Sequence, residues 1–177
     1  SYLYQSANAG ETWEQINILG NNSHWLGRQG WYGNSIMVHP YNKNIVFVGG
    51  IDISKILLTG SSAEILPVST WVPEAVLPFV HADHHGLYSV KTNTGTQAFR
   101  MISTNDGGVE YSDDGGKKWN KTLSGYLTTQ FYGVDKAPGT DEYFGGTQDN
   151  GSWISPVWTS LQNKWINAIG GDGFAVS

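Results

Sequence analysis

The stretch SDDGGKKW at residues 112–119 has a close counterpart in SANAGETW at residues 6–13. Both stretches fit the pattern S-x-[ND]-x-G-x-x-W. If one copy lies between them, the repeat period is about 53 residues, and a degenerate copy, TGSSAEILPVSTW, begins at Thr59. The chain therefore carries an internal repeat.

A second recurrence indicates what each repeat contains. Residues 44–56, 98–112 and 141–155 each hold an apolar strand, a glycine-rich turn with an aspartate, and a second alternating strand. Another strand and a turn rich in Pro, Asn, Gly and Asp precede each segment, as hairpins require. Each unit is thus about four strands in roughly 45–55 residues, which is typical of a β-propeller blade. The turn aspartates of the three units are Asp52, Asp106 and Asp149.

We therefore predict an all-β protein that holds about three and a half four-stranded antiparallel blades of a larger β-propeller. Residues 57–80, which contain Pro67, Pro73 and Pro78, are expected to form an irregular insertion. The predicted divisions are the end of a blade at 1–27, a blade with this insertion at 28–80, blades at 81–127 and 128–167, and the start of another at 168–177. Because a propeller closes with about four to eight blades and bare sheet edges are rare, we expect further blades or another chain to cover the open edges.

Composition excludes several other classes of protein. Only 14% of the residues are charged and the net charge is −5, which argues against a nucleic-acid-binding surface. No apolar run reaches the length of about 18 residues that a membrane span needs. The chain has no cysteine, so it forms neither disulfides nor thiolate metal sites. The first residues, Ser1–Tyr4, already have the pattern of a strand, so we expect an interior fragment or a processed product.

The repeated S-x-[ND]-x-G-x-x-W motif resembles the Asp box, or BNR repeat, of sialidase-like propellers, sortilin-type receptors and xyloglucanase-type glycoside hydrolases. The resemblance implies a structural role, in which the Asn or Asp caps a hairpin turn and the Trp packs across the blade. The residues so assigned are Ser6, Asn8, Gly10, Trp13, Ser112, Asp114, Gly116 and Trp119.

A wider resemblance covers about residues 28–177. The landmarks GRQGWYGNSIMVHP, FVHADHHGLYSV, GGTQDNGSW and GGDGF look like those of large secreted bacterial proteins with a propeller of this kind, which are often labelled glycosyl hydrolase by analogy. The resemblance implies a secreted or cell-surface location. It does not imply a demonstrated reaction.

Blade topology predicts which polar residues share an edge. In a four-stranded up-and-down blade, the loop that enters the first strand and the loop between the second and third strands lie at one edge, and the Asp boxes lie at the other. HADHH at 81–85, residues 130–132 and residues 171–173 would enter first strands, whereas the turn aspartates lie in the other loops of that edge. The ligand-binding candidates at this edge are Arg28, Trp31, Tyr32, His81, Asp83, His85, Gln130, Tyr132 and Asp149.

Three interpretations of this edge stay open, and the first is a divalent metal. His81, Asp83 and His85 would alternate to one side of an extended chain. Neighbouring members are about 6.6 Å apart and could share an ion, whereas the outer two are about 13 Å apart and could not. His81 and Asp83 are therefore the metal candidates, with Asp106 or Asp149 as further ligands. No other cofactor is expected.

The second interpretation is glycoside hydrolysis, which needs two carboxyl groups. The turn that holds Asp106 resembles the segment with one catalytic acid in xyloglucanases, and GGDGF with Asp172 resembles the segment with the second. Those enzymes place the two acids across a cleft between two propellers, and here both lie in nearby blades. The arginine triad of sialidases has no counterpart.

The third interpretation, which we favour, is a binding propeller. Aromatic side chains at a channel mouth suit stacking on sugar faces, and Asp, Asn and Gln suit hydrogen bonds to hydroxyl groups. The sequence thus predicts recognition of a polysaccharide or a surface protein through one channel mouth.

Overall fold

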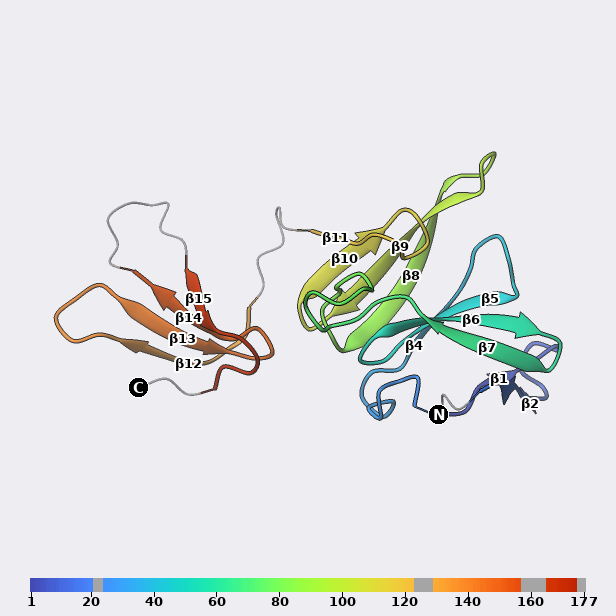
Figure 1. The fold of residues 1–177 in the computed structure, drawn as a ribbon, viewed down its shortest axis with the longest axis horizontal. Coiled ribbons are helices and arrows are strands. Elements are labelled where there is room, and N and C mark those ends of the chain that lie inside the picture. The colour runs from blue at the N-terminus through green and yellow to red at the C-terminus, as the bar shows by residue number, and fades with distance from the viewer. Residues whose placement is uncertain (21–23, 123–128, 157–164, 175–177) are drawn as a thin grey trace. The chain divides into compact units, whose positions relative to one another are not determined.

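The computed structural model describes residues 1–20, 24–122, 129–156 and 165–174, which belong to two compact units, Ser1–Thr122 and Leu123–Ser177 (Figure 1). Within these ranges every regular element is a β-strand, so the all-β prediction is confirmed. Among the same residues there is no helix long and apolar enough to cross a membrane.

The first unit begins with a short hairpin and a five-stranded sheet. The hairpin pairs β1 (Tyr4–Gln5) with β2 (Glu14–Gln15), and the sheet has the order β3-β7-β6-β5-β4. Four of its strands form an antiparallel meander, and β3 adds to its edge parallel to β7. The strands are β3 (Asn17–Ile18), β4 (Ser35–Val38), β5 (Ile45–Gly49), β6 (Ile53–Thr59) and β7 (Ser62–Pro67).

The second sheet of this unit is a four-stranded antiparallel meander in chain order. Its strands are β8 (His84–Asn93), β9 (Ala98–Asn105), β10 (Gly108–Ser112) and β11 (Asn120–Lys121). The run Val46-Phe47-Val48 in β5 is buried on both faces, because one apolar cluster lies on each side of the first sheet. One cluster joins the two sheets through Met37, Phe47, Ile53, Leu87, Phe99 and Met101.

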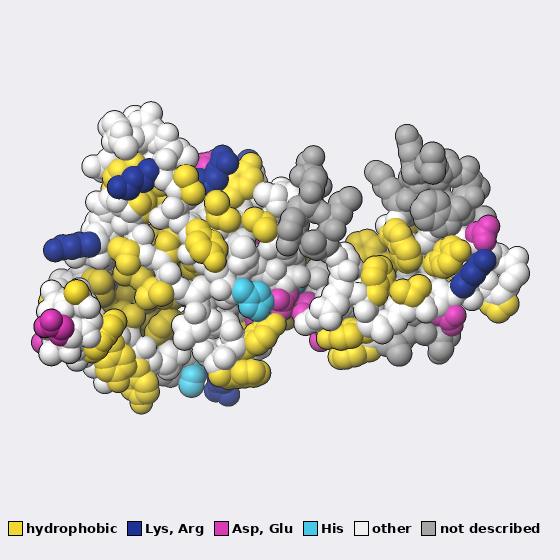
Figure 2. Space-filling view, turned by 180° about the vertical axis from the view of Figure 1, so that it is seen from behind, with side chains coloured by type: hydrophobic (Ala, Val, Ile, Leu, Met, Phe, Trp, Pro, Cys, Tyr) yellow, Lys and Arg dark blue, Asp and Glu magenta, His cyan; other side chains and the backbone are white. Residues whose placement is uncertain are grey.

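The other unit contains one more four-stranded antiparallel meander, with strands β12 (Phe131–Lys136), β13 (Tyr143–Thr147), β14 (Ser152–Ser155) and β15 (Ile166–Ile169). Hydrophobic side chains reach the surface in both units (Figure 2). In the first unit they include Ile36 and Val38 of β4, and in the second Tyr132 and Val134 of β12.

The expected irregular insertion at 57–80 is wrong in its first half. β6 continues to Thr59 and β7 pairs with it along its whole length, because Gly60 at φ 60° makes a tight turn and Ala63 and Ile65 alternate into the core. The irregular segment begins after Pro67 and holds one isolated bridge, between Thr70 and Phe79.

The predicted start of a new blade at 168 is also misplaced. Ala168 and Ile169 belong to β15, and Ile169 pairs with Ser152 of β14. Residues 170–174 are not in a strand, and 175–177 lie outside the described residues.

The repeat found in the sequence is visible in the register of two sheets. Phe47 of β5 pairs with Met37 and Lys55, and Phe144 of β13 pairs with Asp135 and Ile154. The hairpin loops before these central strands are residues 39–44 and 137–142, and a backbone bond closes each: His39 N–H to Ile45 O at 2.9 Å, and Ala137 N–H to Glu142 O at 3.0 Å.

A glycine near the end of each central strand leaves room for the segment that leads onward. A Cβ added to Gly49 would lie 2.7 Å from the Cβ of His84, and one added to Gly146 would clash with the carbonyl oxygens of Gly173 and Phe174. Phe47 precedes Gly49 by two positions, as Phe144 precedes Gly146. The following segment therefore crosses both sheets at the same place.

Candidate functional site

The HADHH segment crosses the turn between β5 and β6 as it enters β8. Asp83 N–H donates to Ile51 O at 3.2 Å, and His84 N–H donates to Gly50 O at 2.8 Å. Asp83 adopts a φ of 62°, so the chain bends there. The expected straight alternation of His81, Asp83 and His85 is therefore wrong.

His85 contacts the aspartate of the next turn. His85 Nε2 lies 2.5 Å from Asp106 Oδ1, and the two side chains are 40% and 14% exposed. The backbone N–H of His81 donates to Glu110 Oε2 at 3.2 Å, and its Nδ1 lies 3.3 Å from Ala82 O. The contact of His85 with Asp106 thus joins the start of β8 to the β9–β10 turn.

Three carboxyl groups interact at this edge. Burial raises the pKa of Asp83, Asp106 raises it further, and His85 and His81 lower it. Burial also raises the pKa of Asp52, against the hydrogen bond from Trp71 N–H at 2.8 Å, and Asp83 adds to the increase. Asp83 Oδ1 is buried and accepts no hydrogen bond from the described residues. Burial therefore favours the protonated form of both Asp52 and Asp83.

Two buried groups under this edge were not among the sequence candidates. His84 is fully buried, and its Nδ1 lies 2.7 Å from Ser103 Oγ. Burial lowers the pKa of His84 to about 4, and repulsion by His81 and His85 adds to this, so the imidazole is neutral at pH 7. Glu110, 3% exposed, accepts from His81 N–H and from the Asn105 amide at 3.2 Å. The alternation of β10 is the signal that would place Glu110 inward.

Aromatic side chains extend the His85–Asp106 pair into solvent. Trp31 is 85% exposed, and its ring centroid lies 5.8 Å from that of Tyr32. Tyr32 in turn meets the ring of His85 edge-on at 5.1 Å. We call Trp31, Tyr32, His85 and Asp106 the rim row.

A tight loop holds the aromatic end of the rim row. Tyr32 N–H and Gly33 N–H both donate to Gln29 O, at 2.8 and 2.9 Å, and Leu26 is buried in the core beneath. Arg28 belongs to the same loop, where it adopts a φ of 64°. The loop therefore presents Trp31 from a fixed base.

The candidates of the other unit form a separate group. Gln130 O accepts from Gln148 N–H at 2.9 Å, and the ring of Tyr132 stacks on that of Phe174 at 5.2 Å. Asp149 N–H donates to Asp172 Oδ1 at 3.0 Å. The structure thus brings Asp172 to Asp149, whereas Asp106, its predicted catalytic partner, belongs to the first unit.

The described residues contain no group of three or more His, Cys, Asp or Glu side chains arranged to hold a metal ion. Of the predicted ligands, Asp106 contacts His85, and Asp149 lies in the other unit from His81 and Asp83. The residues present therefore do not fit the predicted metal site.

The two S-x-[ND]-x-G-x-x-W segments, residues 6–13 and 112–119, have the same hydrogen bonds. Ser112 Oγ donates to Asp114 Oδ1 at 2.9 Å and accepts from Gly116 N–H at 2.9 Å, and the matching distances from Ser6 to Asn8 and Gly10 are 3.0 and 2.8 Å. The indole N–H of each Trp donates to the carbonyl of the box glycine, at 3.2 Å for Trp119 and 3.1 Å for Trp13. The side chains that the motif shares thus bond within their own hairpins.

No protein-family model and no curated protein matches this chain.

Proposed function

We propose that the chain is part of an Asp-box β-propeller of a secreted or cell-surface protein, and that the rim row of its first unit binds a polysaccharide. Three successive antiparallel meanders and the packing of β4 beside β8, the first strands of two neighbouring sheets, support the propeller. The resemblance of residues 28–177 to large secreted bacterial proteins supports the location.

The observation that carries the binding proposal is the position of Trp31. An indole that is 85% exposed costs free energy in water unless a ligand covers it, and its flat face matches the apolar face of a pyranose ring. Asp106, held by His85 at 2.5 Å, offers a carboxylate to sugar hydroxyl groups beside it. Aromatic stacking and an oriented carboxylate together suit a neutral glycan better than a peptide strand.

The test is titration of the full chain with a panel of soluble plant and microbial polysaccharides, followed by tryptophan fluorescence and affinity electrophoresis. We expect Trp31→Ala to weaken binding of the best member about tenfold or more, because a stacking face is lost. The matched control is Tyr2→Ala, which removes an aromatic side chain outside the rim row that is 75% exposed. This variant should bind as wild type does. Failure of every polysaccharide to bind, or unchanged binding by Trp31→Ala, contradicts the proposal.

A glycoside hydrolase is the second candidate, and Asp83 is the observation that favours it. A carboxyl group with a raised pKa beside another carboxyl group, Asp106, is the arrangement of a general acid and its partner. If the rim hydrolyses its ligand, reducing ends should accumulate with wild-type protein and not with Asp83→Asn or Asp106→Asn. Binding without any release of reducing ends contradicts this candidate and leaves the binding proposal intact.

A further inference from the structure

The first unit has a second concave site, away from the rim row. It is a cavity of about 320 Å³ between the two sheets, at the edge that carries the Asp box of residues 112–119. Ile45 and Phe47 of the first sheet and Phe99 of the second form its apolar wall. The ring of His39 meets that of Phe99 at 4.5 Å. A volume near 300 Å³ is enough for a small organic molecule.

Two aspartates and two lysines line this cavity. Asp113 is held by Arg100 through two bonds of 2.7 and 2.8 Å. Asp114 accepts from Ser112 Oγ and from Lys118 N–H, both at 2.9 Å, and Lys117 adds a favourable charge beside it. Both carboxylates thus have partners, and Lys55 is the charged group of the lining that remains.

Lys55 is the less usual of these two cations. It is half-buried, and it lies on β6 directly across from Phe47 on β5. Lys121 and Lys136 form ion pairs with Glu110 and Asp141, whereas Lys55 has no ion pair within the described residues. The ammonium group of Lys55 therefore has no carboxylate partner among the described residues, and a bound anion would supply one.

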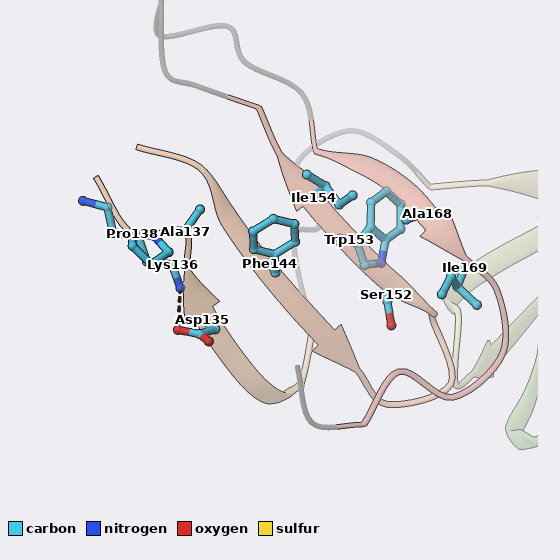
Figure 3. Close-up of a pocket in the computed structure, with 10 residues that line it drawn as sticks. All are labelled: Asp135, Lys136, Ala137, Pro138, Phe144, Ser152, Trp153, Ile154, Ala168 and Ile169. Carbon is cyan, nitrogen blue, oxygen red and sulfur yellow. Dashed lines mark hydrogen bonds between the residues drawn. The ribbon is translucent and has the colours of Figure 1, made fainter. Parts of the chain in front are cut away.

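The other unit shows that the fold does not require a lysine at this register. Ile154 pairs with Phe144 as Lys55 pairs with Phe47. There too the site is concave: a groove of about 630 Å³ is lined by Phe144, Trp153 and Ile154 (Figure 3). The rings of Phe144 and Trp153 lie over strands β13 and β14 (Figure 3). The position opposite the central phenylalanine is therefore an isoleucine in one unit and a lysine in the other.

We infer that the cavity of the first unit binds a small organic anion with an apolar body, of the class of aromatic or branched aliphatic carboxylates. The apolar body lies against Phe47 and Phe99, and the carboxylate accepts a hydrogen bond from Lys55. The site is at the Asp-box edge and is independent of the polysaccharide proposed for the rim row.

The test uses 3-phenylpropionate as the probe and 3-phenylpropanol as its uncharged match, each titrated into the full chain by NMR and calorimetry. The carboxylate should bind wild-type protein at least about tenfold more tightly than the alcohol, because only the carboxylate forms charge-assisted hydrogen bonds. Shifts should appear in the indole signal of Trp119, whose ring packs beside this core, and not in that of Trp31. Equal binding of the two probes, or no binding of either, overturns the inference.

Variants assign the effect to the cavity. Lys55→Met should remove the preference for the carboxylate while keeping the affinity for the alcohol, and Lys55→Arg should retain the preference. Lys43→Met, which removes an exposed charge from the hairpin loop, is the matched control and should behave as wild type. Full carboxylate preference in a folded Lys55→Met protein overturns the inference. The comparison of the two probes on wild type decides the matter if that variant does not fold.

Discussion

The sheets β4–β7 and β12–β15 follow one plan and differ in what covers them. In both, a six-residue hairpin loop leads to a central strand that holds a phenylalanine, and the glycine two positions after it lies beneath the crossing segment. Phe47 is 2% exposed because the second sheet of its unit covers it, whereas Phe144 is partly exposed and lines an open groove. Turns and backbone pairing thus set the strand arrangement of both sheets. The sheet that packs on the phenylalanine decides whether its side chain is buried or available to a ligand.

The largest test of this comparison is truncation of the two phenylalanines. Phe47→Ala should lower the free energy of unfolding of the first unit by about 3–5 kcal/mol, because a fully packed ring leaves a cavity. Phe144→Ala should cost its own unit about 1 kcal/mol, because water already reaches the ring. Hydrogen exchange at the amides of β5 and β13 reads each unit separately. Equal losses would mean that Phe144 is covered in solution, and the comparison would fail.

A second test concerns the crossing segments, where the first unit has His84 and the second has Gly173. A buried imidazole whose pKa falls from 6.5 to about 4 contributes about 3 kcal/mol of stability above pH 6.5, and this is lost as the pH falls towards 4. The raised pKa values of Asp52 and Asp83 act in the opposite sense, since they lower stability as the pH rises above 3.8.

The measurement is urea denaturation at pH 7 and pH 4.5 for wild type and His84→Asn. The wild-type protein should lose more stability between these pH values than the variant does, because the asparagine does not titrate. His85→Asn removes the exposed neighbour and serves as the control, which should retain the wild-type dependence. An unchanged dependence in His84→Asn would show that His84 is not the responsible group.

The prediction with the smallest effect compares the two S-x-[ND]-x-G-x-x-W segments. Their hydrogen bonds match, but the segment at 112–119 is more buried than the segment at 6–13. Ser112 is fully buried, and Ser112→Ala leaves the buried Gly116 N–H without its acceptor, at a cost of about 1–3 kcal/mol. Ser6→Ala should cost less than about 1 kcal/mol, because water can replace the hydroxyl group at the exposed Gly10 N–H. Thermal unfolding of both variants checks the order, and the reverse order would contradict the role of burial.

Much of the strand plan could be predicted because its signals are local. Alternating apolar residues and turn residues near Asp106 and Asp149 mark hairpins wherever the partner strand is adjacent in sequence. The hairpin of β6 and β7 is harder to predict, because Pro67 at the end of β7 has the pattern of a break in the sheet. The parallel pairing of β3 with β7 joins distant segments, so no local pattern specifies it.

The candidate rim was predicted at the level of loops and not of side chains. The order of strands in a four-stranded meander predicts that the start of β8 lies at the same edge as the β9–β10 turn. His85 contacts Asp106 at this edge. The direction of the His85 side chain depends on the bend at Asp83, which arises where the chain crosses the β5–β6 turn. The cavity beside Lys55 depends on the neighbouring sheet, so the residues of one repeat could not reveal it.

The glycines beneath the crossing segments make each sheet a template for the strand that follows. No side chain separates Gly49 from His84, so the entry of β8 rests on a turn that leaves the ribosome about 35 residues earlier. During synthesis the first sheet can form before β8 is available, and the β5–β6 turn then receives the incoming chain. A protein of this design would acquire its binding edge one sheet at a time, in the order of translation.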